Sequence, residues 1–205
     1  MDQWPLALTV AITVTPAVIM VAWWLVRRRS RPDHRLAQDA EDPYRRWVQN
    51  VFLLVTTDCD YAHLPGTEAR RILAHWWDVY GPLEHRRVLQ QLAQPQPRDH
   101  AWDLVRFILV SRLGVAAGML PPEVSWAEIL PVARRLQAAY PNWRAMAHDY
   151  VQARRQWRQL PLDGSDDDQS MIQILDNLAR LHDTRWQEQA FDTALHPDEP
   201  GGADV

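Results

Sequence analysis

The chain has 205 residues, a formal net charge of −4 and one cysteine, Cys59. All 22 of its basic residues are arginine, which excludes reactions that need a lysine, such as Schiff-base formation. A single cysteine excludes an intrachain disulfide and a multi-cysteine metal site, and it fits a reducing compartment such as the cytoplasm.

Residues 5–26 carry no charged side chain and are followed by the basic stretch 27–31. A helix over these 22 residues is about 33 Å long, enough to cross a hydrocarbon core of about 30 Å. Arginines after such a run mark its cytoplasmic end and lie at the lipid headgroups. We therefore expect a single transmembrane helix within residues 1–28, with the N-terminus outside and the rest of the chain in the cytoplasm.

The remaining chain predicts a compact all-α cytoplasmic domain of about six to seven helices at residues 43–195. A basic juxtamembrane linker, residues 29–42, precedes it, and a disordered acidic tail, residues 196–205, follows it. Apolar residues recur three and four apart, and prolines and glycines separate the runs. The helices are predicted at about 43–55, 67–79, 83–93, 98–118, from Ser125 onward, from after Pro141 to 160, and 169–190.

A local motif supports the start of the fifth helix. Ser125-Trp-Ala-Glu128 has the spacing of a capping box, in which Ser125 and Glu128 bond the first free backbone amides. Pro131 then falls one turn inside this helix. No alternating strand pattern, glycine-rich phosphate loop or internal repeat is found.

Arg106 is the unusual residue of the helix predicted at 98–118, because it interrupts an apolar face that extends from Trp102 to Leu113. Asp103 stands three residues earlier, within reach of the guanidinium, and Trp102 can stack on it. Two interpretations remain open. Either the two charges form a buried ion pair that orients helices, or Arg106 lines a pocket and holds an anionic group.

Several segments form a recurring pattern of tryptophans and charges. They are 72–79 with Trp76-Trp77, Ala101-Trp102-Asp103-Leu-Val-Arg106 with Gly114 and Gly118, Ser125-Trp126, and Asn142-Trp143 with Tyr150 and Trp157. Over roughly Val48 to Leu160 the chain resembles the bacterial family known as domain of unknown function 1266. The resemblance implies a tryptophan-rich helical domain without an established reaction, and, with the anchor, a location in the bacterial inner membrane. The chain has Ala153-Arg154 where the family pattern has a glycine before the basic residue.

Enzymatic motifs are weak. The doublets His148-Asp149 and His182-Asp183 invite comparison with metal-dependent phosphohydrolases, but no convincing first histidine accompanies them, the upstream candidates being His75, His85 and His100. The acidic loop 163–168 lacks the spacing and the terminal glutamate of a calcium-binding loop. We therefore assign no catalytic residue, no metal ligand and no cofactor.

The sequence favours a membrane-tethered helical module that binds another protein, as an accessory or immunity protein of a secretion or toxin system does, over an enzyme. The expected contact surface is a tryptophan-rich surface or cleft near Trp76, Trp77, Trp102 and Trp143. The candidate structural or ligand-binding side chains are Trp76, Trp77, Trp102, Asp103, Arg106, Trp143 and Tyr150. The alternative is an anionic-ligand-binding protein or hydrolase that uses Arg106 and Asp103. A nucleic-acid partner is not expected, because the basic stretch is juxtamembrane and no interleaved basic and aromatic patch follows it.

Overall fold

The computed structural model describes residues 39, 41–55, 61–95, 100–158, 169–182 and 184–196. The predicted anchor at 5–26 and the arginines that follow it lie outside the described residues, as do Cys59, the loop 163–168 and residues 197–205. Among the residues that are described, no helix combines the length and the apolar character that a bilayer-crossing helix needs.

The described part of the chain is all-helical and contains no strand, as predicted. It holds eight α-helices and one short 3₁₀ helix, one α-helix more than the upper predicted number. The elements are α3 (Pro43–Phe52), η1 (Tyr61–His63), α4 (Gly66–Trp77), α5 (Pro82–Ala93), α6 (Ala101–Ala116), α7 (Pro122–Ala139), α8 (Trp143–Arg158), α9 (Gln169–His182) and α10 (Arg185–Glu188).

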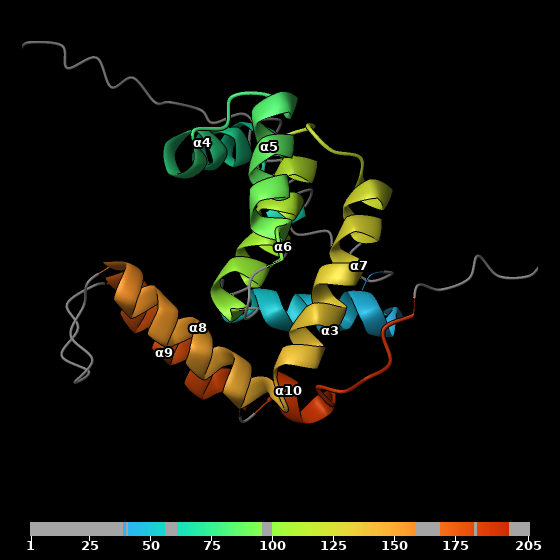
Figure 1. Ribbon diagram of the computed structural model, residues 1–205, viewed down its shortest axis with the longest axis vertical. Coiled ribbons are helices and arrows are strands. Elements are labelled where there is room, and N and C mark those ends of the chain that lie inside the picture. The colour runs from blue at the N-terminus through green and yellow to red at the C-terminus, as the bar shows by residue number, and fades with distance from the viewer. Residues whose placement is uncertain are drawn as a thin grey trace, which may run out of the picture. The chain divides into compact units, whose positions relative to one another are not determined.

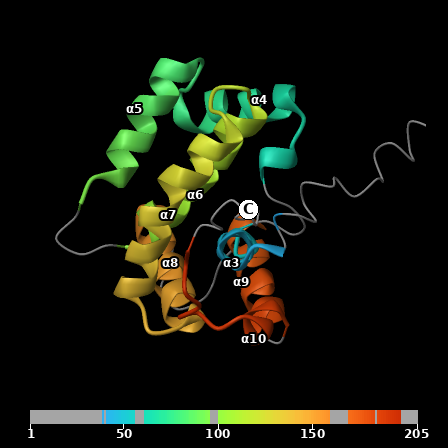
Figure 2. The ribbon, with the colours of Figure 1, turned by 90° about the vertical axis from the view of Figure 1, so that its right-hand side faces the viewer.

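Helix α6 is the centre of the domain. All described residues belong to one compact unit that starts at Asp39, and within it α6 contacts α3, α4, α5, α7, α8 and η1 (Figure 1). Figure 2 shows the same arrangement from the side, with α8 beside α9. A helix surrounded in this way must be apolar on nearly all sides, and α6 is buried along most of its length. Trp102, Asp103 and Arg106 near its start keep partial access to solvent, as do Val115 and Ala116 at its end.

The start of α3 is fixed by local sequence. The Asp42 carboxylate accepts hydrogen bonds from the backbone N–H groups of Tyr44, at 2.8 Å, and Arg45, at 3.3 Å. Pro43 occupies the first helical position, where its missing N–H costs nothing. The predicted start of this helix at Pro43 is therefore confirmed.

The predicted capping box of the fifth helix is wrong. Helix α7 begins three residues earlier, at Pro122. A proline is favoured in the first turn of a helix, where its missing N–H would have no partner within the helix. Ser125 is consequently inside the helix, where its buried hydroxyl lies 2.8 Å from the Ser111 hydroxyl of α6. Glu128 reaches across to form an ion pair with Arg86 of α5.

The last predicted helix, 169–190, is interrupted. α9 ends at His182, Thr184 has a non-helical backbone, and α10 is a single short turn. The break turns the chain so that the buried Trp186 can donate its Nε1–H to the backbone oxygen of Asn50, at 3.3 Å. Tertiary packing therefore overrides the helical pattern of the sequence.

The contact between α5 and α6 depends on a histidine and a glycine. His85 is buried, and its Nε2 lies 2.9 Å from the backbone oxygen of Val110. Because a carbonyl only accepts, Nε2 carries a proton. The ring lies directly over Gly114, where a Cβ atom would stand 2.2 Å from Nε2. Gly114 thus allows the two helices to approach closely.

This buried histidine predicts that the domain loses stability in mild acid. Burial lowers the pKa of His85 below its ordinary value of 6.5. Between these two pKa values the unfolded chain binds a proton that the folded chain does not, so the free energy of unfolding falls as pH drops below about 6.5, with a slope of at most about 1.4 kcal/mol per pH unit. Urea unfolding from pH 7.5 down to 5 measures this slope in the wild type and in His85→Gln. The variant should show a smaller loss, and the exposed His75→Gln variant should keep the wild-type profile. Identical profiles for wild type and His85→Gln would contradict the assignment.

Candidate binding surface

Arg106 lies between two tryptophan rings. Its guanidinium carbon is 4.5 Å from the ring centroid of Trp77 in α4 and 4.9 Å from that of Trp102 in α6. The contact with Trp102 follows from the spacing of four residues on one helix and confirms the predicted stacking. The contact with Trp77 comes from the packing of α4 against α6. Two aromatic walls therefore hold a cation whose side chain is still 24% exposed.

The ion pair within α6 is loose. The distance from Arg106 Nη1 to Asp103 Oδ1 is 3.5 Å, and 37% of the Asp103 side chain is exposed. The pair is therefore not the buried ion pair that one of the two interpretations required. Burial lowers the pKa of the Arg106 guanidinium while the Asp103 charge opposes this effect, and an arginine remains charged at neutral pH.

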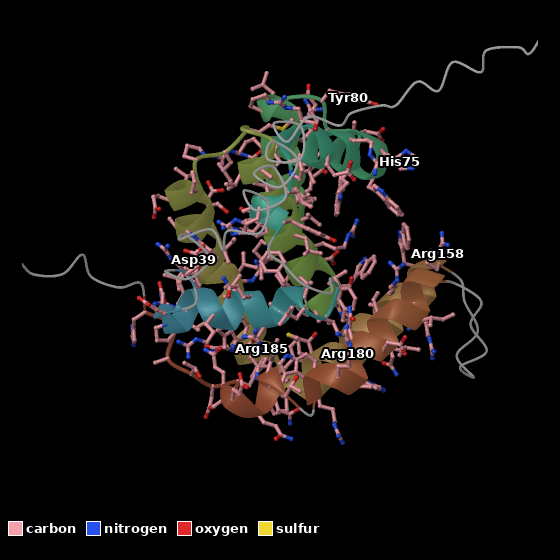
Figure 3. All side chains as sticks on the ribbon, turned by 180° about the vertical axis from the view of Figure 1, so that it is seen from behind. Asp39, His75, Tyr80, Arg158, Arg180 and Arg185 are labelled. Carbon is pink, nitrogen blue, oxygen red and sulfur yellow. The ribbon has the colours of Figure 1, made fainter. Side chains whose placement is uncertain are left out.

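Helix α8 extends this aromatic cluster. The Trp102 ring packs against Tyr150 at 5.2 Å and Trp157 at 5.7 Å between centroids, and the Arg154 guanidinium carbon lies 5.8 Å from the Trp102 centroid. Tyr150 is buried beneath the cluster, whereas Trp157 is 55% exposed. We call Trp77, Trp102, Arg106, Arg154 and Trp157 the arginine–tryptophan surface. In Figure 3, His75 of α4 and Arg158 of α8 lie on the same side of the domain.

Two of the predicted tryptophans lie outside the arginine–tryptophan surface. Trp76 is exposed next to Trp77, and its nearest ring contact is the edge-on His75, at 5.7 Å. Trp143 is only 5% exposed and stacks on Trp186 with centroids 5.5 Å apart. Its Nε1–H donates to the backbone oxygen of Gln189 at 2.9 Å. Trp143 and Trp186 also line a pocket of about 390 Å³. Trp143 is therefore a core residue apart from the other candidates.

Sequence reasoning missed a second arginine on α6, and this one is buried. Arg112 is 2% exposed, and its guanidinium carbon lies 3.8 Å from the ring centroid of Trp126, while Nη1 donates to the Ser125 hydroxyl at 3.4 Å. The same signal that drew attention to Arg106 was present, since Arg112 also interrupts an apolar run. Arg154 and Trp157 were detectable as well, because they follow Tyr150 at helical spacings of four and seven residues.

The first histidine doublet, His148-Asp149, has a structural role, whereas the side chains of the second lie outside the described residues. Asp149 of the first doublet accepts hydrogen bonds from the Tyr140 hydroxyl at 2.6 Å and from the backbone N–H of Ala101 at 3.1 Å. It therefore caps the start of α6 from α8, and His100 Nδ1 lies 3.7 Å from the same carboxylate oxygen. In the described ranges no group of three or more histidine, cysteine, aspartate or glutamate side chains is arranged to hold a metal ion.

Comparison with known proteins finds a family match for part of the chain. No curated protein and no solved structure matches it at a significant level. Residues 95–191 match the family described as protein of unknown function (DUF1266). This match overlaps the predicted resemblance from 95 to 160, extends it through α9 and α10, and leaves out α3, α4 and α5. Residues 95–191, which include α6 to α10, are thus similar to a domain whose function is unknown.

Proposed function

We propose that this protein is a membrane-tethered helical module that binds a partner protein through the arginine–tryptophan surface. The observation that carries the proposal is Arg106, held between Trp77 and Trp102 while its edge remains accessible. Tryptophan, tyrosine and arginine are the residues that dominate the binding energy of protein interfaces. A side chain already fixed by its neighbours loses little conformational entropy when a partner binds.

The charges of the surface define the partner. Arg106 supplies a positive charge with 24% of its side chain exposed, and its contact with the Asp103 carboxylate is long, at 3.5 Å. We infer that the partner presents a carboxylate next to an apolar side chain. The carboxylate would pair with the Arg106 guanidinium, whose fork-like N–H groups match its geometry, and the apolar side chain would cover Trp157.

The tether supports the same function. The apolar run at 5–26 and the arginines at 27–31 favour a single span in a bacterial inner membrane, with the N-terminus outside and the helical domain in the cytoplasm. The 12 residues at 27–38 reach at most about 40 Å when fully extended. A tether of that length concentrates the domain near other membrane proteins, so a weak contact suffices for binding.

Site-specific photo-crosslinking tests the proposal. A benzoylphenylalanine at position 157 of the full-length, tagged protein should form an adduct with one partner protein in its own membranes. The same probe at Leu83, which is 81% exposed on α5, serves as the control and should not form that adduct. Arg106→Gln should abolish the adduct, whereas Arg87→Gln, which changes an exposed arginine of α5, should leave it unchanged.

Three outcomes decide among the alternatives. Equal adducts from positions 157 and 83, or an adduct that survives Arg106→Gln, would contradict the proposed surface. Absence of any protein adduct, together with phosphate binding that Arg106→Gln abolishes, would instead assign the surface to a small anion. Carbonate extraction of the same membranes checks the tether separately, because a spanning protein stays in the pellet.

A further inference from the structure

The three most exposed large apolar side chains in the described part of the chain lie within one short segment. Leu83, Tyr80 and Trp76 are 81%, 74% and 67% exposed, and they surround the connection between α4 and α5. We call these three residues the aromatic tip. The connection lies at one end of the domain in Figure 1, and Tyr80 is labelled there in Figure 3. Exposed apolar side chains gathered in this way are typical of a contact site.

The backbone anchors the connection that carries the aromatic tip. Asp78 has a left-handed backbone, with a φ of 51°, and ends α4. Val79 is fully buried, and its N–H donates to the backbone oxygen of Leu73 at 3.2 Å. Pro82 then begins α5. Tyr80 therefore extends from a turn that is already ordered, so a contact with it costs little conformational entropy of the backbone.

The area and the composition of the aromatic tip favour a bilayer surface over a protein partner. Even at about 250 Å² for each of its three side chains, the tip offers less than the roughly 800 Å² that each partner buries in a stable protein interface. Tryptophan and tyrosine gather at the headgroup level of membranes, because their rings combine an apolar body with a polar edge. A leucine beside them adds apolar contact with the acyl boundary.

The charges near the aromatic tip show which lipids it requires. The exposed Arg87 is opposed by Asp78 and Glu84, and Arg86 forms an ion pair with Glu128. These charges give no net positive charge, and attraction to anionic headgroups needs one. The contact therefore depends on apolar insertion, for which zwitterionic lipids suffice.

We propose that the aromatic tip inserts into the headgroup region of a bilayer, with Trp76, Tyr80 and Leu83 at the boundary with the acyl chains. The inference rests on the tether of the proposed function. A compact domain of about 160 residues is about 40 Å across. With the tip on the bilayer, Asp39 is therefore at most about 40 Å away, which the 12 residues at 27–38 can span. The tether raises the local concentration, so three side chains suffice for the contact.

Photo-crosslinking to lipid tests this inference, with the full-length protein reconstituted into phosphatidylcholine vesicles. A benzoylphenylalanine in place of Leu83 should form a protein–lipid adduct, which mass spectrometry detects as the added mass of one lipid. The same probe in place of Arg185, an exposed residue of α10, should form none, because α10 lies at the other end of the domain from Tyr80 (Figure 3).

Variants of the aromatic tip provide the second arm of the test. Trp76→Ser combined with Tyr80→Ser should abolish the lipid adduct at position 83, and circular dichroism verifies that this variant is folded. Val124→Ser, which changes an exposed apolar residue of α7 outside the tip, is the matched control and should leave the adduct unchanged. Addition of phosphatidylglycerol should leave the yield of the adduct unchanged, because the tip has no net positive charge to attract it.

Several outcomes would overturn the proposal. They are equal adducts from positions 83 and 185, an adduct that persists in the folded double variant, an adduct that requires phosphatidylglycerol, and an adduct with a second copy of the chain in place of lipid. Carbonate extraction of the vesicles separates this failure from that of the tether. Protein that stays in the pellet without a lipid adduct at position 83 overturns the insertion alone, whereas release by carbonate overturns the tether and the insertion together.

Discussion

Replacing Gly114 with alanine should destabilise the domain by roughly 1–5 kcal/mol, the net of two costs and one gain. The added Cβ would stand 2.2 Å from Nε2 and 2.3 Å from Cε1 of His85, a ring that is itself buried. Overpacking of this kind costs about 1–3 kcal/mol. If His85 moves away, the buried Val110 carbonyl loses its donor at a further cost of about 1–3 kcal/mol. Together these effects exceed the gain of about 1 kcal/mol that alanine brings to a helix interior.

Urea unfolding of the full-length protein in detergent measures the effect. His85→Ala removes the clashing ring, so Gly114→Ala should cost less in that background, and the double-mutant cycle should show a clear coupling. Gly81→Ala is the control, because its Cβ would meet only Glu84 Oε2, the end of a flexible side chain, at 3.1 Å. A Gly114→Ala variant as stable as the wild type would show that α5 and α6 adjust to the extra atom.

The elements that were predicted correctly have local causes. The start of α3 at Pro43 follows from a proline and an aspartate cap that adjoin it in sequence. The end of α5 at Ala93 was predicted from the proline-containing segment that follows. The all-α class follows from helical spacing repeated over many turns, a signal to which each turn contributes independently.

The elements that were predicted incorrectly depend on distant contacts. Ser125 and Glu128 have the spacing of a capping box, yet the structure uses them against Ser111 and Arg86 of other helices. The break between α9 and α10 brings Trp186 to the backbone of Asn50, far away in the sequence. Helical periodicity contains no information about such partners. The prediction from sequence therefore extended the last helix through the break to residue 190.

The arginine–tryptophan surface could be predicted only where its contacts join residues that are close in sequence. Trp102 and Arg106 are one turn apart, so their contact could be derived from helix geometry alone. The second wall, Trp77, depends on how α4 crosses α6, which the sequence pattern does not specify. Trp143 and Trp157 share one face of α8 but are fourteen residues apart, or about 21 Å, and so meet different neighbours.

Because of this separation, we expect replacement of Trp143 to lower the stability of the domain and replacement of Trp157 to weaken partner binding. Trp143→Ala should destabilise the domain by about 3–5 kcal/mol, as expected for a large aromatic side chain removed from a core. The ring contacts Trp47, Phe191 and Trp186 at centroid distances of 5.0, 4.9 and 5.5 Å. Its removal also leaves the backbone oxygen of Gln189 without the indole donor.

Trp157→Ala should cost less than about 1 kcal/mol, because more than half of its side chain is already in solvent. Urea unfolding followed by far-ultraviolet circular dichroism compares the two variants, and Trp143→Phe should recover part of the loss by refilling the core. Partner binding should be lost in Trp157→Ala, because this folded variant lacks the apolar contact of the arginine–tryptophan surface. A stable Trp143→Ala variant that no longer binds the partner would move the functional surface to the other end of α8.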